Sequence, residues 1–149
     1  MAVGAVLMMG SAAFAECREG QVELKGDFGQ LAFSIELADT PAERSQGLMF
    51  RETMPRSAGM LFVYEYPQRV AFWMKNTLIP LDMLFVDANG RISHIHENAI
   101  PKDLTVIPGG DSVFAVLEIN GGLVAKYGIS VGNVLRHKVF SNSSPIWPC

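Results

Sequence analysis

The sequence predicts a single, mainly β domain, folded as a sandwich or a barrel with two short helices. About eight short segments with strand character follow one another at roughly even spacing, which is typical of these folds. Residues 88–90, Ala-Asn-Gly, separate two of these segments and are a good hairpin signal. Strands do not alternate with long helices anywhere in the chain, so a doubly wound parallel sheet is not expected.

Four strands and one helix are expected in the first half of the chain. In the second strand, large apolar residues alternate with small or polar ones, which indicates one buried face. For the helix that follows, Thr40 can act as the N-cap, Pro41 suits the first position and Glu43 completes a capping box. Gly47 then offers a left-handed stop. The four strands are expected at 21–25, 31–38, 60–65 and 70–75.

The second half of the chain contains four further expected strands and another short helix. Asn120 is expected to cap this helix over 121–127, and Gly128 to end it. Residues 99–110 read as a loop and 141–149 as an irregular tail. The four strands are expected at 82–87, 91–97, 113–118 and 134–140.

The N-terminal segment 1–15 is predicted to be a secretory signal peptide. It carries no charge, is largely apolar and ends in Ala13-Phe14-Ala15, the small-x-small form of a signal peptidase site. An uncleaved membrane anchor is the alternative, but a spanning helix needs roughly 20 apolar residues. We therefore expect a single mature domain over 16–149, in the periplasm or secreted, with no membrane span.

Charge and cysteine content restrict the partners and the compartment. The net charge is -3, so no electrostatic argument favours a nucleic-acid partner. The two cysteines, Cys17 and Cys149, lie at the two ends of the expected domain and are predicted to form a disulfide in an oxidising compartment. Free or intermolecular thiols are the alternative. The sequence does not predict the oligomeric state.

The polar turn after the fourth expected strand is the leading candidate for a functional site. Lys75 and Asp82 are placed at the two mouths of this turn, as a structural clamp or as two groups of a binding site. Trp73 and Lys75 should point to one side, opposite Phe72 and Met74. An aromatic platform beside convergent polar groups is typical of sites for sugars and other small polar ligands. The candidate cleft comprises Arg44, Arg51, Trp73, Lys75, Asn76, Thr77, Asp82 and Glu118.

This charged group also has a purely structural interpretation. Arg44, Arg51 and Lys75 could pair with Asp82 and Glu118 and so close one end of a barrel, because buried charges must be paired. The sequence does not choose between a site and a scaffold.

Metal binding and common catalytic motifs are not predicted. His94 and His96 share a strand face, and His137 is a possible third zinc ligand, but a solvated strand face is the better interpretation. The methionines are irregularly spaced within apolar runs and are interpreted as core residues rather than Cu(I) ligands. No nucleophile elbow, phosphate loop or dinucleotide-binding glycine pattern occurs, and no cofactor is expected.

Six sequence blocks resemble those of the domain of unknown function family number 192. The resemblance covers roughly residues 31–140, with the blocks in the family's order. It implies a compact, mainly antiparallel β-sandwich or jelly-roll-like domain with short helices, often exported, and no established activity. The blocks are DTPAER at 39–44, GLMFR at 47–51, GMLF at 59–62, FWMKNT at 72–77, PLD at 80–82 and LE at 117–118.

These observations lead to three functional hypotheses. The first is an exported binding or accessory module for a small polar molecule or an envelope glycan. The second is a hydrolase or transferase in which Glu118 or Asp82 is a general acid/base and Lys75 tunes its pKa. The third is an envelope scaffold without a ligand, which should expose an apolar patch.

Overall fold

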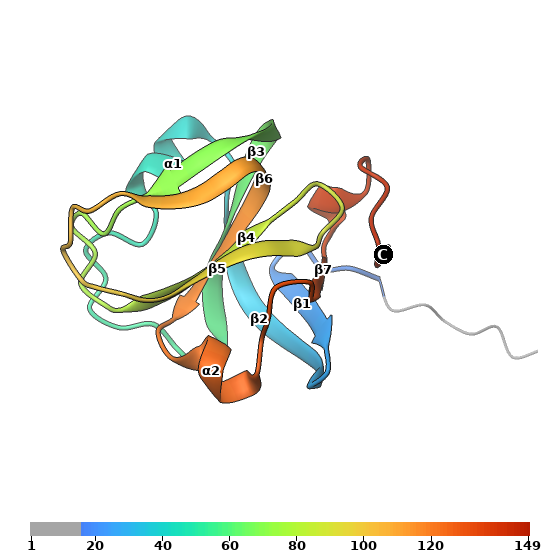
Figure 1. Ribbon diagram of the computed structural model, residues 1–149, viewed down its shortest axis with the longest axis horizontal. Helices are drawn as coiled ribbons and strands as arrows, with labels where there is room; N and C mark the ends of the chain where they lie inside the picture. The colour runs from blue at the N-terminus through green and yellow to red at the C-terminus, as the bar shows by residue number, and fades with distance from the viewer. Residues whose placement is uncertain (1–15) are drawn as a thin grey trace, which may run out of the picture.

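The structure, a computed structural model, describes residues 16–149, which form one curled seven-stranded sheet with two short α-helices (Figure 1). The predicted signal peptide lies outside the described residues. No helix within 16–149 is long and apolar enough to cross a membrane. The elements are β1 (Gln21–Gly26), β2 (Gly29–Ala38), α1 (Pro41–Gln46), β3 (Ala58–Phe72), β4 (Leu81–Val86), β5 (Ile92–Ala99), β6 (Ile107–Asn120), α2 (Leu123–Tyr127), β7 (Val134–Arg136) and the 3-10 helix η1 (Lys138–Phe140).

The sheet curls until its two edges meet at one point. Its strand order is β5-β4-β6-β3-β2-β1-β7. Arg91, just before the edge strand β5, forms a bridge with Val134 of the other edge strand, β7. The backbone N–H of Leu135 donates to the carbonyl of Gly90 at 2.7 Å and adds to this closure. The mainly β prediction is confirmed, in its barrel-like form and not as two packed sheets.

One strand pair departs from the antiparallel arrangement. β2 and β3 are parallel, with Ser34 opposite Ala58 and Ala38 opposite Phe62. Parallel neighbours require a crossover of a dozen or more residues, and residues 39–57, which include α1, supply it. This crossover covers part of one sheet face and forms one wall of the cleft described below.

The strands expected at 60–65 and 70–75 are one long strand, β3, paired with β6 along its length. Pro67 lies between the pairs Val63–Ala115 and Gln68–Val113, where the register shifts. A proline lacks the N–H that a regular ladder needs, so it is tolerated at such an irregularity. β6 is also longer than expected and begins at Ile107, within the predicted loop 99–110.

The second helix begins later than expected and has an unexpected cap. Its first residue is Leu123 and its N-cap is Gly122, which has no side chain to offer. Asn120, the expected cap, instead donates to the carbonyl of Met54 at 2.7 Å. The carboxylate of Asp82 accepts the N–H of Val124 at 2.8 Å and so caps α2 from β4.

Both faces of the central strands are buried, which explains the apolar run 83–86 in β4. On one face, Leu84 and Leu117 belong to a core that includes α2. On the other face, Phe62, Phe85 and Val116 belong to a second core. The methionines Met60, Met74 and Met83 are buried in this second core.

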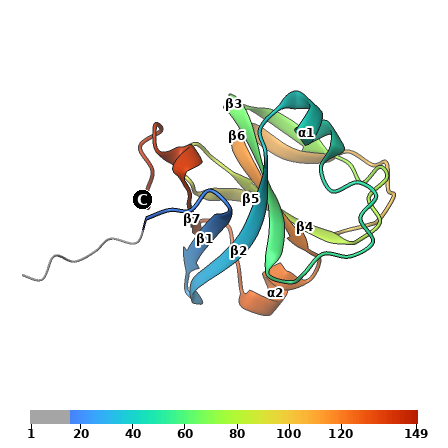
Figure 2. The same cartoon turned by 180° about the vertical axis from the view of Figure 1, so that it is seen from behind.

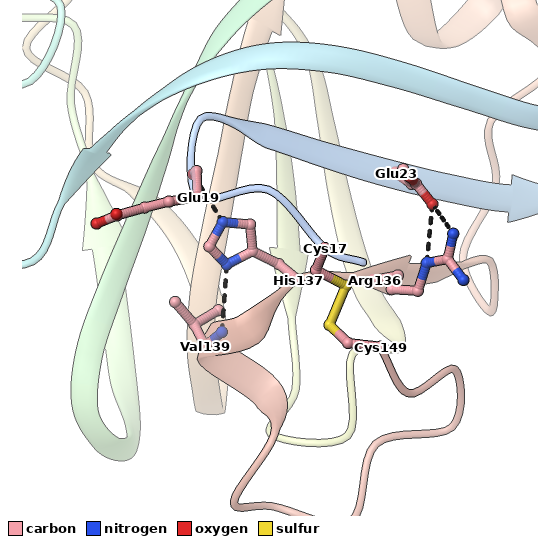
Figure 3. The surroundings of a disulfide bond; sticks show 7 residues. All are labelled: Cys17, Glu19, Glu23, Arg136, His137, Val139 and Cys149. Atoms are coloured by element: carbon pink, nitrogen blue, oxygen red, sulfur yellow. Dashed lines mark hydrogen bonds and ion pairs between the residues drawn. A yellow bond between two sulfur atoms is a disulfide. The ribbon is translucent and has the colours of Figure 1, made fainter. Parts of the chain in front are cut away.

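The termini are joined by the predicted disulfide between Cys17 and Cys149, with a Cα–Cα distance of 5.4 Å (Figure 3). Close to it, Arg136 pairs with Glu23. The guanidinium of Arg136 also lies 4.3 Å from the ring centroid of Trp147 in the tail. The last expected strand, 134–140, is shortened to β7, because the His137 side chain accepts the N–H of Val139 at the start of η1.

Candidate functional site: a cleft beside α1

A cleft of about 370 Å³ opens between the α1 crossover and β3. In both views α1 lies away from the C-terminus, so the cleft and the disulfide are at different ends of the molecule (Figure 2). The cleft is lined by Pro41, Arg44, Ser45, Gln46, Gly47, Leu48, Met49, Phe62, Tyr64, Ala71, Phe72, Trp73, Thr77 and Glu118.

The capping box fixes the helix that forms the first wall. The hydroxyl of Thr40 accepts the N–H of Glu43 at 3.2 Å, and the Glu43 carboxylate accepts the N–H of Thr40 at 3.2 Å. The Glu43 carboxylate also accepts the N–H of Asp39 at 3.1 Å, and the hydrogen bonds from the Asp39 and Thr40 N–H groups lower the pKa of Glu43. Gly47 ends the helix with φ +48°, and a Cβ there would lie 3.1 Å from the ring of Phe62. A glycine therefore lets the crossover approach the aromatic floor closely.

Arg44 belongs to the wall, and its hydrogen bonds hold α1 against β3. Its Nη1 donates to the carbonyls of Asp39 at 2.9 Å and Val63 at 2.8 Å, while Nη2 pairs with Glu65 at 3.1 Å. The guanidinium lies 5.0 Å from the ring centroid of Tyr64. Because these contacts use much of its donor capacity and Glu65 balances its charge, Arg44 is a poor anion ligand.

Glu118 differs from Arg44, the other charged side chain that lines the cleft, because its carboxyl has no partner within 16–149. It is 4% exposed and lines the cleft, yet no charged or hydrogen-bonding partner within 16–149 acts on its carboxyl. Burial alone raises the pKa of Glu118 to about 8, because a charge there lacks solvation. Since no enclosed side-chain oxygen or nitrogen of these residues lacks a partner, the unpaired carboxyl must contact the cleft.

The strand register places Glu118 there. Its neighbours across β6 are Met60 on β3 and Met83 on β4. Gly59, which precedes Met60, allows β3 to approach β6 closely, because a Cβ at Gly59 would lie 2.5 Å from the backbone oxygen of Glu118. The carboxyl is therefore held between two thioether side chains by rigid sheet backbone.

Aromatic rings form much of the remaining surface. Phe62 and Phe72 contact edge to face with centroids 5.0 Å apart, and Trp73 is 47% exposed beside them. Tyr64 is half-buried, and burial is the main reason that its pKa is raised above 10. The nearby Glu118 also raises the pKa of Tyr64, while Arg44 lowers it.

Half of the eight predicted site residues meet in this cleft: Arg44, Trp73, Thr77 and Glu118. Trp73 and Lys75 share one side as expected, with the Lys75 Nζ 5.1 Å from the Trp73 ring centroid, and Met74 is buried on the other. Lys75 itself does not line the cleft. Asn76 does not line the cleft either, and its carbonyl accepts the N–H of Phe50 at 2.8 Å.

The other two predicted residues lie elsewhere and have structural partners. Arg51 pairs with Glu36 on β2, and this pairing lowers the pKa of the Glu36 carboxyl. Asp82 is fully buried and accepts two backbone N–H groups, those of Asn98 and Val124, both at 2.8 Å. Asp82 is therefore placed to hold elements together.

The alternative in which these charges pair with one another is not found: no ion pair within 16–149 joins these cations to Asp82 or Glu118. Lys75 forms neither a clamp nor a joint site with Asp82, because Lys75 points to solvent and Asp82 into the core. The ion pairs found within 16–149 join Arg44, Arg51, Arg69 and Arg136 to Glu65, Glu36, Asp111 and Glu23, respectively.

The histidines do not converge. His94 and His96 lie on β5, and His94 stacks on Phe85 with centroids 5.5 Å apart. His137 is buried near the disulfide, and its two ring nitrogens contact the Glu19 carbonyl at 2.8 Å and the Val139 N–H at 3.2 Å (Figure 3). No group of three or more His, Cys, Asp or Glu side chains within 16–149 could hold a metal ion.

Sequence reasoning missed three aromatic members of the site: Phe62, Tyr64 and Phe72. Phe62 and Phe72 were visible as apolar positions in expected strands, but alternation alone does not say which buried face is hollow. Tyr64 is the detectable signal, since a tyrosine within an apolar strand commonly needs a polar partner for its hydroxyl.

The chain matches the DUF192 family, described as "Uncharacterized ACR", over residues 22–137. It belongs to this family. A crystal structure of a protein of unknown function from Novosphingobium aromaticivorans DSM 12444 is similar, with 39% identity and a TM-score of 0.76 over 89% of this chain and 99% of that one. A candidate transcription regulator from Sinorhizobium meliloti 1021 has 40% identity and a TM-score of 0.76 over 83% and 96%. A comparison with curated proteins finds no match.

In this DUF192 domain, the blocks that carried the resemblance gather around the cleft. Blocks 39–44 and 47–51 form the crossover wall, and 59–62 and 72–77 supply aromatic residues. Block 117–118 supplies Glu118. The remaining block, 80–82, supplies the Asp82 cap of α2.

Proposed function

We propose that this protein binds a small polar molecule in the cleft beside α1, with Glu118 as the group that contacts it. The observation that carries the proposal is a buried carboxyl without a partner, placed on rigid strands and facing a cleft. A buried polar group without a partner costs free energy, so a carboxyl of this kind at a concave surface supports a functional role for it. The aromatic rings around it would hold the apolar part of a ligand.

The proposed setting is the periplasm or the outside of the cell. The expected signal peptide and the terminal disulfide both support an oxidising compartment. The name of the relative from Sinorhizobium meliloti suggests gene regulation, but we do not extend it to this chain. With a net charge of -3, a nucleic-acid backbone is a poor partner.

Nuclear magnetic resonance titration tests the proposal with three chemically different probes: N-acetylglucosamine, acetamide and n-butylammonium. At least one probe should shift backbone signals from residues around the cleft. Glu118→Gln should weaken that binding, whereas Glu97→Gln, an exposed carboxyl on β5, should not. If no probe perturbs the cleft at its solubility limit, the proposal is wrong.

An enzymatic role for Glu118 is the second candidate. A carboxyl with a pKa of about 8 is largely protonated at neutral pH and suits a general acid. A hydrolase or transferase of this kind should lose turnover by roughly two or more orders of magnitude in Glu118→Gln. A binding protein should lose only affinity. Asp82 does not share this role, since its oxygens already accept backbone N–H groups.

The scaffold alternative also has one supporting observation. Phe50, Ile100, Leu104 and Val106 are each more than half exposed. Their loops are connected by backbone hydrogen bonds such as Lys102 N to Thr77 O at 3.0 Å. A scaffold would use this surface without any ligand in the cleft, so the probe titration separates the two roles.

A further inference from the structure

We propose that the ligand of this cleft carries an alkylammonium group, whose positive charge is balanced by the carboxylate of Glu118. This inference rests on the proposed binding function and narrows its ligand class. Its basis is the combination of one unbalanced acidic group with aromatic walls in a cleft of about 370 Å³.

The charge balance of the surrounding elements favours a cationic ligand. Arg44, the cation of the cleft wall, is already balanced by Glu65. Lys75 at the rim points outward, over the ring of Trp73. No residue within 16–149 supplies a countercharge to Glu118. An ammonium group on the ligand would supply one, and its N–H would donate a charge-assisted hydrogen bond, among the strongest in proteins.

The walls favour the same ligand. Phe62, Tyr64 and Phe72 line the cleft, and the faces of aromatic rings attract cations through their quadrupoles. Two side-chain cations already use this attraction at the margin of the site: Arg44 over Tyr64 and Lys75 over Trp73. The alkyl part of the ligand would pack against the apolar rings.

An anionic ligand is disfavoured by the same groups. A carboxylate or phosphate would approach Glu118, and any ionisation of that residue would repel it. The Nη1 atom of Arg44 donates to the carbonyls of Asp39 and Val63 and would have to give up these bonds to bind an anion.

The pH dependence distinguishes a cation from a neutral ligand. A cation binds ionised Glu118 and displaces its proton, so affinity should rise about tenfold per pH unit well below pH 8 and level off above it. A neutral hydrogen-bond acceptor would prefer the protonated carboxyl and lose affinity as the pH rises toward 8 and above.

The neighbouring titratable groups do not produce the same profile. Tyr64 on β3, with its raised pKa, stays protonated in this range. On α1, Arg44 is paired with Glu65. Glu43, also on α1, is held by the capping box. Asp82 on β4 lies opposite Ile119, one residue from Glu118, and binds backbone N–H groups.

The test compares n-butylammonium with n-butanol, a neutral ligand of the same length, by calorimetry on the wild-type protein. We expect at least about a tenfold preference for the cation, since hydrogen bonds to charged groups are the stronger ones. Titrations in two buffers of different ionisation enthalpy should show release of close to one proton at neutral pH. Glu118→Gln should abolish both effects, and Glu97→Gln neither.

A second variant guards against misfolding of Glu118→Gln. Phe72→Leu keeps an apolar side chain but removes a ring, and should weaken n-butylammonium more than n-butanol. Equal affinity for the two probes, or an affinity for the cation that does not change with pH, would overturn the inference. Glu118-dependent binding of acetamide or N-acetylglucosamine without binding of n-butylammonium would overturn it and leave the proposed function intact. Failure of every probe would overturn both.

Discussion

Glu118 owes its raised pKa to burial, and strand register places it in this buried position. It is flanked by Met60 and Met83, and neither thioether can stabilise a negative charge as water does. The carboxyl therefore keeps its proton to about pH 8, although its sequence context, a single glutamate in an apolar strand, looks ordinary. The functional property lies in what surrounds the residue.

This burial makes the stability of the protein depend on pH. The folded-state pKa of Glu118 is raised above the ordinary value of 4.5, so the folded state binds its proton more tightly than the unfolded state does. The contribution of this protonated carboxyl to the free energy of unfolding is fully present below pH 4.5 and is lost as the pH rises toward 8. The slope is at most about 1.4 kcal/mol per pH unit. Urea unfolding at several pH values should show this decline in the wild type and a flatter profile in Glu118→Gln.

The matched control is Glu97→Gln, which changes an exposed carboxyl on β5. Its profile should run parallel to that of the wild type. A Glu118→Gln profile that also runs parallel to the wild type would show that Glu118 is ionised at neutral pH in the folded protein. The statement that burial raises the pKa of Glu118 would then be wrong.

The different environments of the Lys75 and Asp82 side chains could not be predicted from the sequence. Lys75 and Asp82 stand at the mouths of one turn, as predicted, but their side chains point to different environments. The direction of Asp82 is decided by Val124, which lies 42 positions further along the chain. No local pattern contains that contact, so the sequence alone could not separate a cap from a catalytic group.

At the scale of elements, Asp82 joins α2 to β4 and β5. It accepts the N–H groups of Val124 in α2 and of Asn98 in β5. In Asp82→Ala the N–H of Val124 would be left buried without a partner, at a cost of roughly 1–3 kcal/mol, and the part-buried N–H of Asn98 would also lose its acceptor. We expect a loss of about 2–5 kcal/mol in the free energy of unfolding.

Asp87→Ala is the matched control for this prediction. Asp87 also accepts two backbone N–H groups, those of Asn89 at 2.9 Å and Arg91 at 3.1 Å, but it lies in a half-exposed turn. Water can replace the lost acceptor there, so the loss should be clearly smaller, about 1 kcal/mol. Equal losses in the two variants, measured by urea unfolding, would contradict the capping role of Asp82.

The predicted elements were most reliable where a local motif defines them. The capping box of α1 is confirmed because Thr40, Pro41 and Glu43 act on one another within one turn. The break expected in β3 around Pro67 is wrong because pairing with β6 resumes beyond the irregularity and holds the chain extended. Partner strands decide such cases, and a single sequence does not name the partner.

For the whole molecule, the mainly β class followed from evenly spaced apolar segments, and the structure confirms it. The parallel β2–β3 pair did not follow, since it depends on where a crossover returns to the sheet. The cleft is a consequence of that crossover, because α1 forms its wall. Only half of the candidate residues could therefore be found from their chemistry alone.

The disulfide acts on the whole chain and gives the last prediction. It joins residues separated by 132 positions, and the loop-entropy account assigns such a crosslink about 4–5 kcal/mol. Reduction should lower Tm by about 10 °C or more. It should also free the tail in which Trp147 contacts Lys25 and Arg136, at 4.7 and 4.3 Å, so tryptophan emission should shift to longer wavelength.

Three variants separate this effect from changes at the cleft. Cys17→Ser/Cys149→Ser should reproduce the Tm of the reduced wild type. Trp147→Phe leaves Trp73 as the remaining tryptophan, and its emission should not change on reduction, because the cleft lies away from the tail (Figure 2). An unchanged Tm after reduction, with two free thiols verified by mass spectrometry, would show that β7 and the bridge at Arg91 hold the barrel closed without the crosslink. A change in Trp73 emission would instead show that the disulfide-bonded ends of the domain and the cleft are coupled through the sheet.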